Sequence, residues 1–170
     1  DWVVTPRIGK PVEINALWIN ALHTMADFAR LLVRPGEGYE KLAEKATRNF
    51  QKFWNPERDC CFDVIDEPGG GNDTSLRSNQ IFGVSLPVSP LSERQQKSVV
   101  DAVAKHSLTS HGLRSLAPSE PGYKEKYAGG PRERDSAYHQ GTVWAWLLGP
   151  FALAHFRVYG DRAAAQSFLE

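Results

Sequence analysis

Four stretches of this sequence carry apolar residues at the three- and four-residue spacing of an amphipathic helix. The clearest stretch covers residues 13–33, and similar patterns predict helices near 39–54, 92–106 and 141–159. The stripe of the first helix consists of Ile14, Leu17, Trp18, Ala21, Leu22, Met25, Phe28, Ala29 and Leu32. Nowhere does the sequence alternate strand and helix patterns as a parallel sheet requires. The periodicity therefore predicts an all-α domain.

Local signals mark helix starts and the segments between helices. Ser92 and Gln95 have the spacing of a capping box, and Asp161 has the position of an N-cap for a further helix. Residues 79–86 fit a strand or a helix, and residues 112–116 are expected to form one short turn. The connections are long, and long connections in a compact domain commonly carry function. We therefore expect the loops to build a site at one end of the helices.

The balance of charged residues limits which kinds of ligand are expected. The 170 residues include 20 Lys+Arg and 20 Asp+Glu, so the formal net charge is zero. Nucleic acids and anionic membranes usually require a basic excess, so we expect neither as a partner. A neutral substrate is compatible with this balance, and the length fits one domain.

The cysteines and histidines do not indicate a metal site. Cys60 and Cys61 are adjacent, and adjacent cysteines rarely bond to each other. His106 and His111 are five residues apart in an expected loop, which is a weak pattern for a metal site. We therefore expect reduced thiols, a cytoplasmic location, and no metal or other cofactor. Nucleotide-binding and serine-hydrolase motifs are also missing from the sequence.

The stretch GGPRERDSAYHQGTVWAWLLGPF, residues 129–151, places hydrogen-bonding side chains directly beside indoles. Sugars require this combination, because their hydroxyls bind polar groups while their C–H faces pack on aromatic rings. The alternative is a buried helix whose start is held by His139 and Gln140, and the residues alone leave both open. The candidates for binding are Arg134, Asp135, Tyr138, His139, Gln140 and Trp144.

Two groups in this stretch could suggest catalysis. His139 has neither a motif-marked nucleophile nor a second histidine at ligand spacing, so we interpret it as binding hydroxyls or completing a core. Glu133 and Asp135 are close in sequence. Inverting glycoside hydrolysis needs two carboxyl groups about 6.5–9.5 Å apart on opposite sides of the scissile bond. Residues so near each other seldom reach that arrangement.

A second polar cluster lies at the expected start of the first helix. It contains Arg7, Glu13, Asn15 and Trp18, and the helix dipole favours an ionised carboxylate at Glu13. One interpretation is a sugar subsite with a carboxylate and an amide beside an indole. The other is ordinary helix-start chemistry with a core tryptophan.

A third polar cluster precedes the apolar residues 81–86. It contains Asp73, Arg77, Asn79 and Gln80. It fits either a binding loop or a loop with a capping aspartate.

Three segments together resemble successive blocks of the C-terminal catalytic domain of bacterial and archaeal glycogen debranching enzymes. They are DWVVTPRIGKPVEINALW, DTSLRSNQIFGVSLPVSPLS and RDSAYHQGTVWAWLLGPF, in the same order and over nearly the whole chain. The resemblance implies a glucoamylase-like (α/α)6 toroid, with residues 1–170 as a fragment of one helical-toroid glycosidase domain. It implies inverting hydrolysis of α-1,6-linked glucosyl stubs in an α-glucan such as glycogen or limit dextrin.

The resemblance also implies that both principal catalytic carboxylates lie elsewhere. The general acid would belong to a Trp-Met-Asp-Ala type motif before the first block, and the general base to a Ser-Glu-Ile-Phe-Asp type motif after the last helix. Neither motif occurs in these 170 residues, so the catalytic residues are unknown. We expect the chain to be inactive alone. We also expect open apolar helix faces, which favour self-association.

By resemblance, thirteen residues would line a glucose subsite, with Glu13 recognising hydroxyls rather than transferring a proton. They are Arg7, Glu13, Asn15, Trp18, Arg77, Asn79, Gln80, Arg134, Asp135, Tyr138, His139, Gln140 and Trp144. Two alternatives stay open. One is another helical-toroid α-glycosidase of glucoamylase or trehalase type, and the other is a non-catalytic glucan-binding helical module.

Overall fold

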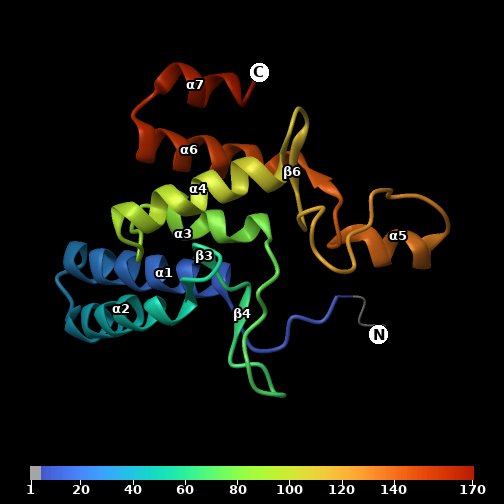
Figure 1. Cartoon of the computed structure of the whole chain (residues 1–170). Coiled ribbons are helices and arrows are strands. Elements are labelled where there is room, and N and C mark those ends of the chain that lie inside the picture. Colours follow the sequence, from blue (N-terminus) through green and yellow to red (C-terminus); the bar gives the residue numbers. More distant parts are fainter. Residues whose placement is uncertain (1–4) are drawn as a thin grey trace.

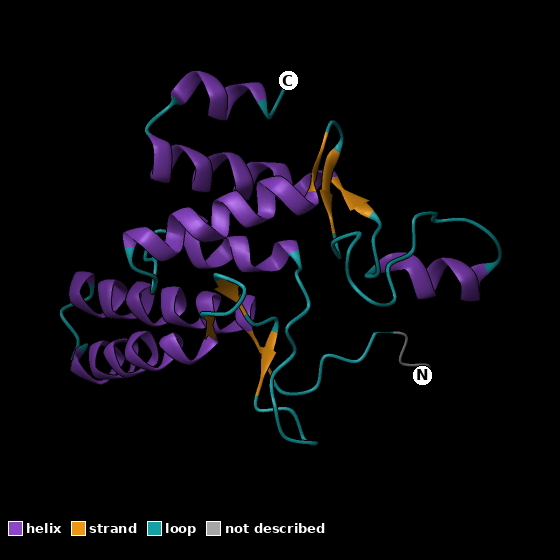
Figure 2. Cartoon of the chain, in the orientation of Figure 1, coloured by secondary structure: helices purple, strands orange, loops and turns teal. Residues whose placement is uncertain are grey.

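Helices dominate the computed structural model, which describes residues 5–170. Residues 1–4, which begin the first of the three blocks, lie outside the described residues. The long helices lie side by side, and the strands and most connections gather at one end of them (Figure 1; Figure 2). The helices are α1 (Val12–Leu31), α2 (Glu37–Phe50), α3 (Phe82–Ser85), α4 (Glu93–Ser107), α5 (Pro131–Tyr138), α6 (Leu148–Tyr159) and α7 (Arg162–Ser167), with the 3-10 turns η1 (Gln51–Phe53), η2 (Ser78–Ile81) and η3 (Ala145–Leu147).

Within residues 5–170, short antiparallel strands pair both neighbouring segments and, in β1–β4 and β6–β7, segments that are distant in sequence. They are β1 (Lys10–Pro11) with β4 (Val64–Ile65), β2 (Trp54–Asn55) with β3 (Cys60–Cys61), and β5 (Leu108–Thr109), β6 (Gly112–Arg114) and β7 (Val143–Trp144) in the order β5-β6-β7. Lys10 pairs with Ile65, which brings the start of α1 beside β4. Leu113 pairs with Trp144, which ties the segment before α6 to the end of α4. The expectation of an all-α domain is therefore correct for the body but misses these strands.

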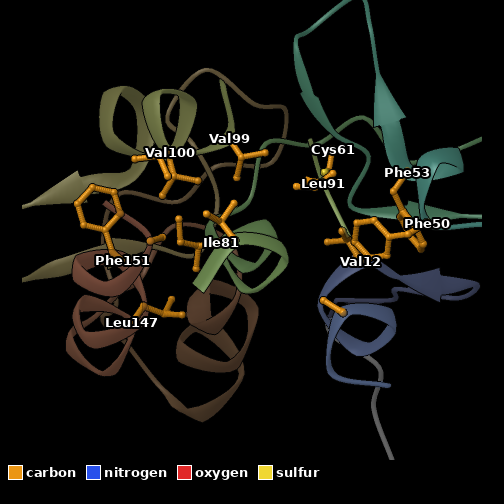
Figure 3. Packing of buried hydrophobic residues seen from close by; sticks show 14 of the residues in the cluster. Val12, Phe50, Phe53, Cys61, Ile81, Leu91, Val99, Val100, Leu147 and Phe151 are labelled. Carbon is orange, nitrogen blue, oxygen red and sulfur yellow. The ribbon is translucent and has the colours of Figure 1, made fainter. Parts of the chain in front are cut away.

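One apolar core runs through the helical body (Figure 3). Val12 and Phe50 contribute to it from the α1–α2 pair, and Ile81 comes from η2. Val99 comes from α4 and Phe151 from α6, so helices from both halves of the sequence share the same core. The helix signals at residues 79–86 and 92–106 are explained by this burial, because both segments face the core.

Helix α1 buries a face that overlaps the predicted stripe only at Leu22 and Ala29. Its buried residues are Val12, Ala16, Ile19, Leu22, Ala26 and Ala29. Most large residues of the predicted stripe other than Leu22 are exposed, including Trp18 at 55% and Phe28 at 53%. Small alanines on the buried face let the backbone of α2 approach closely, whereas large side chains would hold it away. The helix is thus apolar on two sides, and one of them is open in this chain.

Both predicted caps are confirmed. The Ser92 hydroxyl accepts a hydrogen bond from the Gln95 backbone N–H, and the Gln95 side-chain oxygen accepts one from the Ser92 backbone N–H. The Asp161 carboxylate accepts a hydrogen bond from the Ala164 N–H at 2.9 Å and begins α7. Residues 79–86, which fitted a strand or a helix, are helical as η2 and α3 up to Ser85.

The expected short turn at residues 112–116 is wrong, because Gly112–Arg114 form the central strand of a sheet. Gly112 has a φ of +149° and lies against the Trp144 carbonyl, where a side chain would collide. The helix predicted for 141–159 begins only at Leu148, since strand pairing holds residues 143–144 extended. Helix α5 was not predicted, because only one of its residues, Ala137, is buried and no apolar stripe marks it.

Two further sequence expectations concern the membrane and the thiols. Within residues 5–170, no helix has both the length and the apolar character needed to span a bilayer. Cys60 and Cys61 are both free, as expected from their adjacency, and both are buried. Burial raises the pKa of the Cys61 thiol, which keeps it protonated and unreactive.

Candidate functional site

A cavity of about 400 Å³ lies where the start of α1, the η2–α3 segment and the chain around residue 139 converge. Its volume falls within the range of small-molecule sites, about 300–1,000 Å³. It is lined by Thr5, Arg7, Glu13, Arg77, Asn79, Phe82, Ser115, Tyr138, His139, Trp144, Trp146 and Leu147. Members of all three polar clusters identified in the sequence therefore meet at one place.

Arg7 is held between two carboxylates. Its guanidinium donates to both oxygens of Glu13 at 2.5 and 2.8 Å, and to both oxygens of Asp63 at 2.7 and 2.8 Å. The Asp63 side chain is 1% exposed, whereas Glu13 lines the cavity. Asn79 donates to the Glu13 carboxylate at 3.2 Å from η2. Glu13 is therefore fixed from two directions.

The β1–β4 pairing places these groups. The Val12 N–H donates to the Asp63 carbonyl at 3.0 Å, so the first turn of α1 starts against the residue before β4. Glu13 follows in that first turn, where the partial positive charge of the helix start stabilises a carboxylate. Asp63 was not predicted, although a single charged residue in the apolar run CCFDVI, residues 60–65, is a usable signal for a buried ion pair.

Arg77 connects the two sides of the cavity. Its guanidinium donates to the Ser115 carbonyl at 3.2 Å, to the His139 carbonyl and to the Gln140 side-chain oxygen at 2.8 Å. Its Nε lies 3.2 Å from an Asp63 oxygen without hydrogen-bond alignment, so this contact is an ion pair only. The side chain is 7% exposed. Arg77 is thus a buried support for the segment that carries His139.

The charges of this network balance, because two guanidiniums face two carboxylates. Burial lowers the pKa of Arg77, and the neighbouring Arg7 adds to this, while Asp63 opposes it. Burial alone would also lower the pKa of Arg7, but hydrogen bonds to Glu13 and Asp63 outweigh burial and raise it. Both groups stay protonated at neutral pH. The cavity therefore presents a polar but neutral surface.

The surroundings of His139 favour its neutral imidazole. Partial burial lowers its pKa, and the positive charges of Arg77 and Arg7 lower it further. A neutral imidazole has one donor and one acceptor nitrogen. His139 can therefore both donate to and accept from hydroxyl groups in the cavity.

Aromatic rings form the opposite wall. Tyr138 lies 4.5 Å from Trp144 and 4.7 Å from His139 between ring centroids. Phe82 stacks on Trp146 at 6.1 Å, and Trp146 is 60% exposed. The Trp144 indole N–H donates to the Tyr138 carbonyl at 3.2 Å, which fixes the turn between the two rings. Ring faces beside amide and carboxylate groups form the combination that binds sugars.

Some predicted site residues do not reach this cavity. Asn15 and Trp18 line a separate cavity, and the Asn15 amide donates to the Pro11 carbonyl at 2.8 Å. They lie on a different side of α1 from Glu13, so the structure does not bring them together. Arg134 and Asp135 are exposed on α5 and do not line the cavity.

Two predicted glutamines support the site from behind. Gln80 is buried, accepts from the Cys61 N–H at 3.1 Å and donates to the Arg77 carbonyl at 3.1 Å. Gln140 binds the Arg77 guanidinium instead of lining the cavity. Phe82 and Ser115 do line it but were not predicted, because each follows an ordinary apolar or loop pattern.

The donor groups of the site are a poor match for a metal ion. Among residues 5–170, no group of three or more His, Cys, Asp or Glu side chains is placed to hold a metal ion. Glu13 is also the only carboxylate among the cavity-lining residues of the described chain. The cavity is therefore suited to binding polar neutral molecules by hydrogen bonds and ring contacts.

Similar solved structures come from a bacterial glycosidase. GH63 mannosylglycerate hydrolase from Thermus thermophilus, solved with Tris, matches 94% of this chain and 35% of that chain, at 18% identity and a TM-score of 0.71. The glucose complex of the same enzyme also matches 94% of this chain and 35% of that chain, at 20% identity and a TM-score of 0.72. At these identities the likeness concerns the fold, which is helix-rich and shared with the GH63 structures.

Sequence comparison gives the family. Glycogen debranching enzyme of Saccharomyces cerevisiae is 27% identical over 200 residues, an alignment that covers 89% of this chain and 12% of the yeast protein. The chain thus spans about an eighth of that relative and about a third of the Thermus enzyme. The model of the amylo-alpha-1,6-glucosidase family matches residues 1–169. The chain therefore belongs to the amylo-alpha-1,6-glucosidase family of debranching glycoside hydrolases.

Proposed function

We propose that this chain forms the substrate-binding wall of an amylo-α-1,6-glucosidase, which removes α-1,6-linked glucosyl stubs from an α-glucan such as glycogen or limit dextrin. The supporting observation is the charge-balanced cavity in which Glu13, Asn79 and His139 face an aromatic wall. Family membership supports the reaction class. The chain would be a fragment of a single (α/α)6 toroid domain, in keeping with the share of its relatives that it spans.

The proposed role of Glu13 is hydroxyl recognition. Both of its oxygens accept hydrogen bonds from Arg7, and one also accepts from Asn79. The oxygen that Asn79 does not contact, Oε2, accepts only from Arg7 and keeps a lone pair that can accept from a sugar hydroxyl. A carboxylate held in this way is well oriented but poorly suited to donating a proton. His139 would bind a second hydroxyl, and Trp144 and Trp146 would contact the C–H face of the ring.

Catalysis would need groups outside this cavity wall. Inversion requires two carboxyl groups about 6.5–9.5 Å apart with a water between them. Among the described residues only Glu13 provides a carboxylate to the cavity, since Asp63 is buried behind Arg7. We therefore propose that the 170-residue chain binds α-glucan without hydrolysing it, and that the rest of the domain supplies the acid and the base.

The test compares trisaccharides by calorimetry. Panose carries an α-1,6 glucosyl unit and maltotriose does not, so we expect panose to bind more tightly. Glu13→Gln loses a charged hydrogen-bond acceptor, which weakens binding about tenfold or more. Glu44→Gln is the matched control, because Glu44 is exposed on α2 and does not line the cavity. Equal affinity in Glu13→Gln, His139→Ala and the unaltered chain would refute the proposed site.

Turnover is tested separately. We expect no glucose release from branched limit dextrin by the 170-residue chain, and release by the full-length parent polypeptide. Release by the short chain would overturn the assignment of acid and base to other parts of the domain. Binding without turnover in the parent would instead favour a non-catalytic glucan-binding module. Preferential hydrolysis of trehalose or maltose by the parent would favour a different toroid glycosidase.

We also propose a cytoplasmic location and contacts through the open helix faces. Buried free thiols at Cys60 and Cys61 are typical of a reducing compartment. The exposed apolar residues Leu17, Phe28 and Leu153 lie on α1 and α6, where further helices of a toroid or a second copy would cover them. Sedimentation as a strict monomer that binds no hydrophobic dye would contradict the second proposal.

A further inference from the structure

A second cavity, of about 320 Å³, lies between α1, the α2–η1 segment and the β1–β4 ladder. Its floor consists of apolar core residues that include Ile19, Phe50 and Phe53. Its polar lining consists of Lys10, Asn15, Lys45, Asn49, Lys52 and Asp66, and the Trp18 indole forms part of the same lining. None of these residues lines the candidate sugar site.

The charges here do not balance. Lys10 donates to the Asp66 carboxylate at 2.5 Å, and this hydrogen bond lowers the pKa of Asp66. Lys45 and Lys52 make no side-chain hydrogen bond or ion pair with any residue in the range 5–170. The three lysines of the lining therefore exceed its one carboxylate by two positive charges. The candidate sugar site, by contrast, pairs every guanidinium with a carboxylate, which suits a neutral ligand.

The spacing brings these groups together. Lys45, Asn49 and Lys52 are separated by four and three residues, so they lie on one side of α2 and its continuation η1. Asn15 and Trp18 are three residues apart on α1, which lies alongside α2 (Figure 1). Two ammonium groups and an amide thus lie across from an indole and a second amide.

We propose that this cavity binds a hexose phosphate. A phosphate monoester carries a charge of about −1.5 to −2 at neutral pH, which matches the ammonium groups of Lys45 and Lys52, neither of which forms a hydrogen bond or ion pair within residues 5–170. The indole of Trp18 is 55% exposed and offers a face for the C–H groups of the sugar ring. Within residues 5–170, Asn49 makes no side-chain hydrogen bond and the Asn15 amide oxygen accepts none, so both can bind hydroxyls.

Other ligands use only part of this lining. Inorganic phosphate would engage the lysines and leave Trp18 and the amides without a role. A neutral glucan would leave both ammonium groups unpaired. The site is independent of the proposed glucan cavity, because the two share no lining residue in the part of the chain that the structure describes. The phosphorylated hexose could be a free sugar phosphate or a phosphorylated unit of a glucan chain, and both carry the same recognition chemistry.

The experiment measures binding to the 170-residue chain by calorimetry. The probes are glucose 6-phosphate, glucose, inorganic phosphate and a maltodextrin phosphorylated at a 6-hydroxyl. We expect glucose 6-phosphate to bind at least tenfold more tightly than glucose or inorganic phosphate. Tighter binding of the phosphorylated maltodextrin assigns the site to polymer, and tighter binding of glucose 6-phosphate assigns it to a free metabolite.

Two variants distinguish the contribution of the lysine charges from that of the Trp18 ring. Lys45→Gln with Lys52→Gln removes both unpaired charges, and we expect glucose 6-phosphate affinity to fall tenfold or more, with a weaker dependence on salt. Lys41→Gln is the matched control, because Lys41 is an exposed lysine of the same helix that does not line the cavity. Trp18→Ala should weaken glucose 6-phosphate binding and leave phosphate binding unchanged.

Three results would overturn the proposal. One is no binding of glucose 6-phosphate at about 10 mM, well above the dissociation constants of weak specific sites. Another is unchanged affinity in the Lys45→Gln, Lys52→Gln variant, and the third is equal affinity for inorganic phosphate and glucose 6-phosphate. Panose binding at the other cavity should be the same in the lysine variants, so failure of this proposal is distinguishable from failure of the proposed function.

Discussion

Replacing Asp63 by asparagine tests whether the buried network holds the candidate site together. Asp63 accepts two hydrogen bonds from Arg7 and forms an ion pair with Arg77, and its side chain is 1% exposed. Asparagine has the same shape but offers one acceptor oxygen, and its amide N–H groups would face a guanidinium. The substitution therefore removes from the buried Arg77 the one carboxylate with which it forms an ion pair within residues 5–170.

The expected loss of folding stability in Asp63→Asn follows from the burial of the ion pair. Breaking a buried ion pair by removing one partner costs about 3–5 kcal/mol. Arg7 keeps Glu13 and is 19% exposed, so we place the loss for Asp63→Asn near the lower end, about 3 kcal/mol. With a urea dependence of about 2 kcal/mol per molar, the unfolding midpoint should fall by about 1.5 M.

The assay is urea unfolding followed by tryptophan fluorescence. Asp66→Asn is the matched control, because Asp66 lies three residues further along and pairs with Lys10 at the exposed surface. Its midpoint should equal that of the unaltered chain, since exposed ion pairs contribute little. If Asp63→Asn also unfolds at the unaltered midpoint, the network does not stabilise the fold and the reasoning is refuted.

The remaining predictions concern pH, backbone and capping. The pKa of His139 is lowered in the folded chain, so the unfolded chain binds more protons near pH 6, and the free energy of unfolding should fall as pH drops below about 6.5. Urea unfolding between pH 5 and 8 should show a smaller decrease in this free energy for His139→Gln than for the unaltered chain. Gly141 has a φ of +135° with the Lys124 carbonyl against it, so Gly141→Ala should cost about 2 kcal/mol or more and weaken panose binding, whereas Gly149→Ala, in open space, should do neither in the same two assays. Ser92→Ala should lower the free energy of unfolding by about 1 kcal/mol in urea, and an unchanged value would mean that the capping box is not formed in solution.

Helical periodicity predicted the body of this fold but not the orientation of its first helix. The stripe from Ile14 to Leu32 predicts the helix correctly, yet the structure buries only Leu22 and Ala29 of that stripe, together with a neighbouring face that contains Ala16 and Ala26. Hydrophobicity alone favours the larger residues for the interior. Packing against α2 decides otherwise, because close helix contact selects small side chains, and that contact is not visible in the pattern of α1.

Residues of the candidate site could be predicted where the neighbouring sequence alone determines the position of the side chain. Glu13 follows Pro11 at a helix start, and His139 stands beside aromatic residues, so both could be named from the sequence. Trp18 and Glu13 are only five residues apart, but the turn of the helix directs them to different cavities. Asp63 was missed because its role depends on Arg7, which lies 56 residues earlier in the chain.

Arg77 explains why residues so distant in sequence form one cavity. Its ion pair with Asp63 fixes it to the β1–β4 ladder, and its hydrogen bonds fix it to the carbonyls of Ser115 and His139. Its hydrogen-bond partners within residues 5–170 are uncharged acceptors, so Asp63 is the one carboxylate there that forms an ion pair with it. The position of the aromatic wall therefore depends on a charge buried on the opposite side of the cavity. Replacing Asp63 should therefore disturb the sugar-binding face, even though Asp63 itself lies outside the cavity lining.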